Sequence, residues 1–138
     1  MKTIIRTTFD IKVVSIFLFI SSFMYFCVNP NKYPLLGTVL IGYPAQILWV
    51  TSCLICLLAS YGFWKKKLYA WKMIMGYSLF CLVNIIVNFF FLSCEERASI
   101  ITENNYIDSD YSLFFFLLSL ALEILFVFYL LKRRKVFT

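Results

Sequence analysis

Four long apolar stretches divide this chain of 138 residues and constrain its fold more than any other feature. They cover residues 11–28, 35–64, 68–92 and 112–131, close to or above the roughly 20 residues that a membrane-spanning helix needs. Lipid offers no partner to a free backbone amide or carbonyl, so a spanning segment must be a helix or part of a closed barrel. The stretches lack the alternating pattern of barrel strands. The sequence therefore predicts an all-α membrane protein, an antiparallel bundle of four transmembrane helices in a single domain.

The composition supports lipid as the solvent and excludes several classes of function. With 62% hydrophobic and 14% charged residues, a soluble domain of this size would have too little interior for its apolar surface. The chain has no His, which removes the usual metal ligand and the commonest general base. No nucleophile stands beside a base, and no nucleotide-binding loop is present. We therefore expect no enzymatic activity, no metal and no cofactor.

The ends of the stretches follow from proline and asparagine. The sequence Asn29-Pro30-Asn31 ends the first stretch, because Pro lacks the amide donor and Asn-Pro favours a turn. The second stretch is long enough to tilt in the membrane or to kink at Pro44. The acidic segment at residues 93–110 separates the third stretch from the fourth.

The distribution of Lys and Arg predicts the orientation, because cytoplasmic loops carry an excess of both. Only Lys32 and Arg97 fall on one side, with the acidic connection. The other side carries Lys2, Arg6, Lys12, Lys65, Lys66, Lys67, Lys72, Lys132, Arg133, Arg134 and Lys135. Both termini are therefore expected in the cytoplasm, in a multi-pass protein of the cell membrane, which we take to be a bacterial inner membrane.

The basic residues predict contact with membrane lipids. The net charge of +6 would suggest nucleic acid only if these residues shared one soluble face, and here they flank apolar stretches. We expect no nucleic-acid partner. Contacts with lipid headgroups are expected from two runs, which comprise Lys65, Lys66, Lys67, Lys132, Arg133, Arg134 and Lys135.

Glu123 is the sharpest candidate for function, because it stands in the middle of the fourth apolar stretch. A carboxylate at the bilayer centre costs at least about 2.5 kcal/mol, so it should be protonated, paired or turned inward. Asn84 and Asn88 share a helix face on the third stretch, and Asn84 falls at a depth similar to Glu123. We expect an Asn84–Glu123 hydrogen bond, with Gln46 joining this intramembrane polar site at the outer level. The carboxyl is either a proton or cation site or a structural helix–helix bond.

Cys53 and Cys56 form a C-x-x-C sequence inside the second stretch. A redox motif of this kind needs a thiolate, which requires a helix N-terminus, a positive neighbour or solvent access. The alternative is a packing face of small residues, since Ser52, Cys56 and Ser60 recur every four positions.

Cys27 and Cys94 end the first and third stretches on the same side of the predicted membrane. They would form a disulfide if that compartment is oxidising and the two helices are neighbours.

The turn between the second and third stretches, Gly62-Phe63-Trp64-Lys65-Lys66-Lys67-Leu68-Tyr69-Ala70-Trp71, resembles the G-[LF]-W-x-x-K-x-x-A-W turn of small, uncharacterised bacterial membrane proteins. The resemblance covers this turn alone and implies a shared tight cytoplasmic hairpin, with no activity. Small multidrug transporters are similar only in having four short spans and one membrane carboxylate. That family carries its carboxylate in the first helix, where this chain has none.

These observations lead to one main hypothesis and two alternatives. The main hypothesis is a non-enzymatic protein that acts by association, as an accessory subunit or an immunity-type protein, with another membrane protein or further copies of itself as partner. The first alternative is a small proton- or cation-coupled transporter or channel component that uses Glu123. The weaker alternative is a membrane thiol oxidoreductase.

Overall fold

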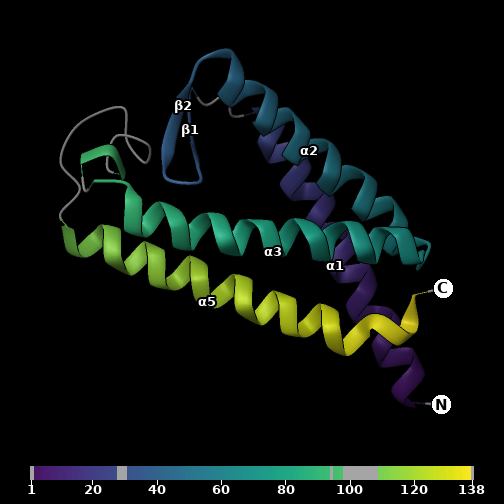
Figure 1. Ribbon diagram of the computed structural model, residues 1–138. Helices are drawn as coiled ribbons and strands as arrows, with labels where there is room; N and C mark the ends of the chain where they lie inside the picture. Colours follow the sequence, from purple (N-terminus) through teal and green to yellow (C-terminus); the bar gives the residue numbers. More distant parts are fainter. Residues whose placement is uncertain (1, 28–30, 94, 98–108, 138) are drawn as a thin grey trace.

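The computed structural model describes residues 2–27, 31–93, 95–97 and 109–137. Two short strands, β1 (Lys32–Leu35) and β2 (Thr38–Ile41), form an antiparallel hairpin after the first helix (Figure 1). The helices are α1 (Lys2–Cys27), α2 (Tyr43–Trp64), α3 (Leu68–Phe91) and α5 (Ser109–Arg133), and a 3-10 turn follows at Arg134–Val136.

Three helical segments are long and apolar enough to cross a membrane. Within the described part of the chain they are Tyr43–Trp64, Leu68–Phe91 and Leu113–Val136. The protein is therefore a mostly helical, multi-pass membrane protein, as the sequence predicts. The predicted first stretch coincides with the second half of α1 up to Cys27.

The second predicted span begins later than expected, and this corrects its boundary from residue 35 to Tyr43. Residues 32–41 form the β hairpin and not the start of a helix. Leu36 and Gly37 make its two-residue turn, and both adopt positive φ angles, 46° and 83°. Gly42 follows at a φ of 72° and starts α2. Pro44 stands in the first turn of this helix, where a backbone amide has no hydrogen-bond partner within the helix, so proline's lack of an amide proton costs no bond. Pro44 therefore begins α2 and does not kink it.

The connection between α2 and α3 is as tight as the sequence predicts. Three residues, 65–67, link the helices, and Lys66 closes the turn at a φ of 54°. The Lys67 amide donates a 2.8 Å hydrogen bond to the Gly62 carbonyl oxygen, so the last turn of α2 leads directly into α3.

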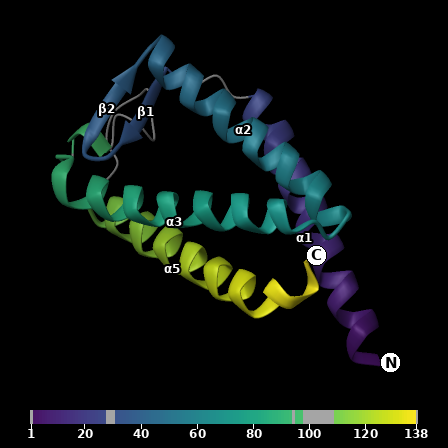
Figure 2. The same cartoon turned by 45° about the vertical axis from the view of Figure 1, so that its right-hand side comes forward.

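The helices contact one another in chain order, α1 on α2, α2 on α3 and α3 on α5. From the turn at residues 65–67, α2 and α3 diverge, and the β hairpin lies between the start of α2 and the end of α3 (Figures 1 and 2). The start of α1 and the end of the described chain lie at the same end of the molecule as this turn, and α1 extends beyond it (Figures 1 and 2). We refer to the two ends of the molecule as the turn end (residues 65–67) and the hairpin end (residues 32–41).

The buried core lies at the turn end, where all four helices supply side chains. Phe63 and Phe137 pack there as tilted rings with their centroids 4.7 Å apart, so the residues after α5 cover the end of α2. The core is formed by Ile11, Leu18, Ala59, Phe63, Ala70, Trp71, Ile74, Met75, Leu130 and Phe137.

Candidate functional site

Asn84 and Asn88 hold the turn of the β hairpin against α3. The side-chain oxygen of Asn84 accepts a 2.7 Å hydrogen bond from the Leu36 amide, and that of Asn88 accepts an equally short bond from the Gly37 amide. The Asn84 side-chain amide also donates to the Pro34 carbonyl oxygen at 3.1 Å. Both asparagines are buried, and the backbone groups that they satisfy would otherwise face an apolar environment.

This arrangement corrects the expected hydrogen bond between Asn84 and Glu123. The polar atoms of the Asn84 side chain are engaged by the hairpin, and Glu123 has the hydroxyl of Ser78 as its side-chain hydrogen-bond partner. Sequence spacing placed Asn84 and Glu123 at similar depth, but it carried no sign that residues 32–41 would fold back between the helices. Two asparagines one helical turn apart, such as Asn84 and Asn88, can therefore indicate hydrogen bonds to the backbone of a neighbouring segment as well as an intramembrane polar site.

Glu123 stands near the middle of α5 and is partly buried on the side that faces α3. Ser78 of α3, its hydrogen-bond partner, is 2% exposed. The Gln46 side chain, which we expected to join this site, lies in the first turn of α2 and therefore at the hairpin end. Of the predicted polar group, the structure thus joins Asn84 with Asn88 and places Glu123 with a different partner.

A groove of about 370 Å³ lies between α2, α3 and β1. Its wall includes the polar side chains of Tyr33, Thr51, Ser52, Lys72 and Tyr77. The Tyr33 hydroxyl hydrogen-bonds to Ser52, and burial, together with the nearby Cys81, raises the pKa of Tyr33 above its ordinary value. Tyr33 therefore remains a neutral hydroxyl that links the hairpin to α2.

Among the cysteines whose side chains the structure describes, Cys53, Cys56 and Cys81 are free thiols. Cys53 and Cys56 are buried, and the Cys53 thiol donates a 3.3 Å hydrogen bond to the Ser22 carbonyl oxygen on α1. Ser52 and Ser60 are buried as well, as the packing-face interpretation of this stripe requires. If Cys53 nevertheless serves redox chemistry, it should react with a membrane-permeant alkylating agent in the native protein near neutral pH. The predicted Cys27–Cys94 disulfide is not tested, because Cys94 and the side chain of Cys27 lie outside the described part of the chain.

The predicted basic runs surround the turn end, and sequence reasoning missed one ion pair there. Arg133 pairs with Asp10, which joins the end of α5 to α1, so this arginine is engaged within the protein. The guanidinium of Arg134 lies 5.5 Å from the centroid of the Trp71 ring, and the Trp71 indole donates a 2.7 Å bond to the Leu130 carbonyl oxygen. The side chains that remain exposed at this end include Lys65, Lys67, Lys132, Arg134 and Lys135.

The described part of the acidic connection forms a capping box. The Ser93 hydroxyl accepts a bond from the Glu96 amide at 3.1 Å, and the Glu96 carboxylate accepts one from the Ser93 amide at 2.8 Å. Hydrogen bonds to the Glu96 carboxylate from the backbone amide and the side chain of Ser93 lower the pKa of Glu96 below its ordinary value. Arg97 then reaches back to the Phe89 carbonyl oxygen at 3.0 Å, which closes the end of α3.

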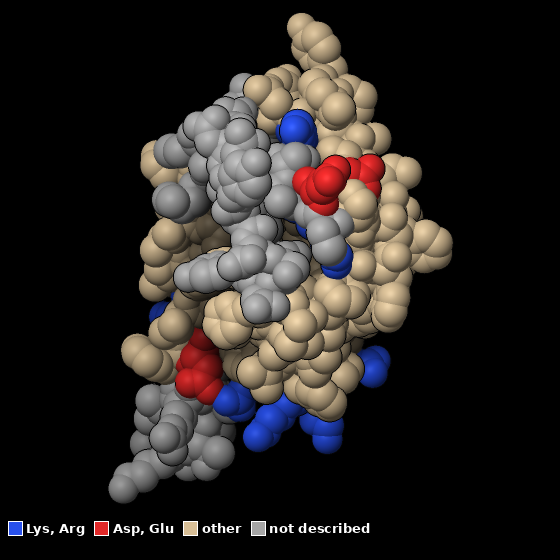
Figure 3. All heavy atoms as spheres, turned by 90° about the vertical axis from the view of Figure 1, so that its left-hand side faces the viewer, with Lys and Arg blue, Asp and Glu red and all other residues tan. Residues whose placement is uncertain are grey.

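Charge is sparse on the face seen from the left of Figure 1. Acidic and basic side chains lie side by side near the two ends of this face, and the described surface between these areas is mostly uncharged (Figure 3). Among the described residues, no cluster of Cys, Asp and Glu side chains has the geometry to hold a metal ion. Comparison with protein-family models, curated proteins and solved structures gives no match.

Proposed function

We propose that this protein acts by association within a bacterial inner membrane, as an accessory subunit or an immunity-type protein without enzymatic activity. In this proposal α1, α2, α3 and α5 all span the membrane and both termini lie in the cytoplasm. The proximity of the termini to the basic turn at residues 65–67 supports that orientation, because Lys and Arg are retained on the cytoplasmic side.

The observation that carries the proposal is the exposure of α5 around Glu123. Among its described side chains, only Leu130 is buried, whereas Leu122 and Leu125 beside the carboxyl are 58% and 64% exposed. Glu123 is thus a half-buried polar group at the middle of a helix whose main neighbour among the described elements is α3. Covering such a group with a partner helix removes it from lipid, which supplies a physical reason for association.

Site-specific crosslinking tests this proposal. A photoreactive side chain at position 122 should give a discrete adduct with a partner helix in native membranes. The same side chain at position 54 of α2 is the control, because Leu54 is also an exposed leucine in a spanning helix. Glu123→Leu should abolish the adduct from position 122, and Glu123→Gln should retain it. Equal labelling from positions 122 and 54 would show that α5 has only lipid as its neighbour.

A coupled transporter is the second candidate, and the groove between α2, α3 and β1 favours it. That groove brings Thr51, Ser52 and Tyr77 to one surface together with the cation Lys72. Transport would require Glu123 to release its proton during the cycle. Glu123→Gln would then abolish coupled uptake or efflux while the protein still assembles. An association protein keeps its activity with this substitution.

A further inference from the structure

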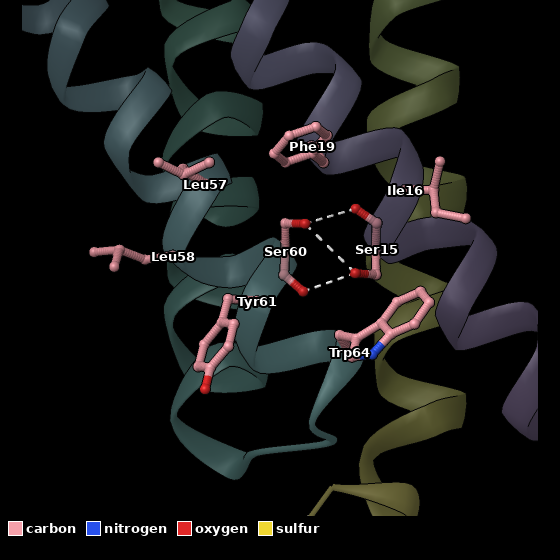
Figure 4. Close-up of a pocket in the computed structure, with 8 residues that line it drawn as sticks. All are labelled: Ser15, Ile16, Phe19, Leu57, Leu58, Ser60, Tyr61 and Trp64. Atoms are coloured by element: carbon pink, nitrogen blue, oxygen red, sulfur yellow. Dashed lines mark hydrogen bonds between the residues drawn. The ribbon is translucent and has the colours of Figure 1, made fainter.

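A second groove runs between α1 and α2 on the outside of the molecule, with a volume of about 480 Å³ (Figure 4). Ile16 and Phe19 line it from α1, and Leu57 and Leu58 line it from α2. Most of its lining side chains are apolar, and a hydrocarbon chain is the kind of group that gains by contact with such walls.

Two serines between the helices offer the groove no free donor. The Ser15 hydroxyl donates to the Ser60 carbonyl oxygen at 2.7 Å, and the Ser60 hydroxyl donates to the Ser15 carbonyl oxygen at 2.8 Å (Figure 4). This reciprocal pair uses both hydroxyl hydrogens within the protein. A polar ligand between these walls would receive no hydrogen bond from the two serines. An apolar chain needs no hydrogen bond and is not penalised by their absence.

The polar and charged groups of the groove stand at its turn end. Trp64, the last residue of α2, lines the groove and is 47% exposed, and Tyr61 beside it is 63% exposed. The Lys12 ammonium lies 5.0 Å from the centroid of the Trp64 ring, so the indole fixes a cation at this end. Trp and Tyr prefer the headgroup level of a bilayer, which places the Lys12 charge at the depth of lipid phosphates.

We propose that this groove binds one anionic glycerophospholipid of the leaflet at the turn end. One acyl chain lies between Ile16 and Leu58, and the phosphate contacts Lys12 above the Trp64 ring. Charge complementarity selects this occupant over a zwitterionic lipid, because Lys12 and the adjacent exposed Lys65 leave the mouth of the groove positive. The site is separate from Glu123 and does not depend on the proposed association through α5.

Native mass spectrometry of the full-length protein in detergent tests the headgroup contact. Phosphatidylglycerol and phosphatidylcholine with the same acyl chains are titrated separately, and we expect tighter binding of phosphatidylglycerol. Lys12→Gln should weaken phosphatidylglycerol binding about fivefold and phosphatidylcholine binding less, because the choline cation already offsets the charge of that phosphate. Lys32→Gln is the matched control, since it removes the same charge from β1 at the opposite end. Equal binding of both lipids, or an equal loss in both variants, would overturn the proposal.

A second pair of variants tests the acyl-chain contact. Leu58→Trp places a large ring in the groove and should reduce the binding of both lipids. Leu54→Trp, one helical turn away at a similarly exposed position outside the groove, should leave binding unchanged. Both substitutions are at exposed sites, and a far-UV circular dichroism melt verifies that each variant folds. Full lipid binding by folded Leu58→Trp would show that the groove is not the site.

Discussion

The close approach of α2 and α3 at Gly62 makes a quantitative prediction for Gly62→Ala. A methyl group at position 62 would overlap the Cβ of Ala70 and lie 3.0 Å from the Tyr69 ring carbon that bears the hydroxyl. The Ala70 Cβ is fixed to the α3 backbone, so the helices must separate at the turn. Overpacking of this kind costs about 1–3 kcal/mol, and the better helix propensity of alanine offsets up to about 1 kcal/mol of it. We expect a net loss of about 1–2 kcal/mol.

Unfolding in mixed micelles of detergent and dodecyl sulfate, followed by far-UV circular dichroism, measures this loss. Gly76→Ala is the control, because a Cβ built there meets no described atom within 4 Å apart from its chain neighbours and the adjacent backbone of its own helix. It should be neutral or stabilise by up to about 1 kcal/mol. Adding Ala70→Gly to Gly62→Ala removes the overlap and should recover at least about 1 kcal/mol relative to the sum of the single changes. Equal stability of Gly62→Ala and Gly76→Ala would refute the close packing of this turn.

Three further predictions concern contacts outside this turn. Asn84→Ala leaves the Leu36 amide unpaired, at a cost of about 1–3 kcal/mol, and should speed hydrogen exchange of that amide; unchanged exchange would contradict the clasp. The pKa of Glu96 is lowered in the folded protein, so the bonds of its carboxylate stabilise the cap of residues 95–97 at any pH above the ordinary carboxyl pKa. This stabilisation is lost as the pH falls through the lowered pKa. Glu96→Gln should remove this pH dependence from the amide hydrogen exchange of these residues. Asp10→Arg and Arg133→Asp should each destabilise by up to about 1 kcal/mol, and the double variant should recover part of the loss; purely additive losses would exclude a direct pair.

The G-[LF]-W-x-x-K-x-x-A-W turn gains a physical explanation from these contacts. Gly62 and Ala70 are small because the two helices touch there, and Trp71 carries the indole donor for the Leu130 carbonyl oxygen. Lys67 supplies the amide that closes α2, which any residue except proline would do. The spacing of small and aromatic residues quoted for this turn is therefore explained by helix packing.

The sequence by itself determined the membrane environment, the helical class and the tight turn between α2 and α3. Each of these depends on local properties, namely the length of the apolar runs and the small residues near the turn. Glu123 was also evident from the sequence, because a carboxyl in an apolar helix is conspicuous without any knowledge of its neighbours.

Only the tertiary structure decided which groups Asn84, Asn88 and Arg133 contact. The hairpin at residues 32–41 reads as apolar sequence continuous with α2, and its extended form depends on the positive φ angles at Leu36 and Gly37 and on the asparagines that accept its amides. Arg133 contacts Asp10 across 123 positions of sequence. Such pairings are set by how the helices diverge and converge in space, and the periodicity of one segment contains no information about the distance to another.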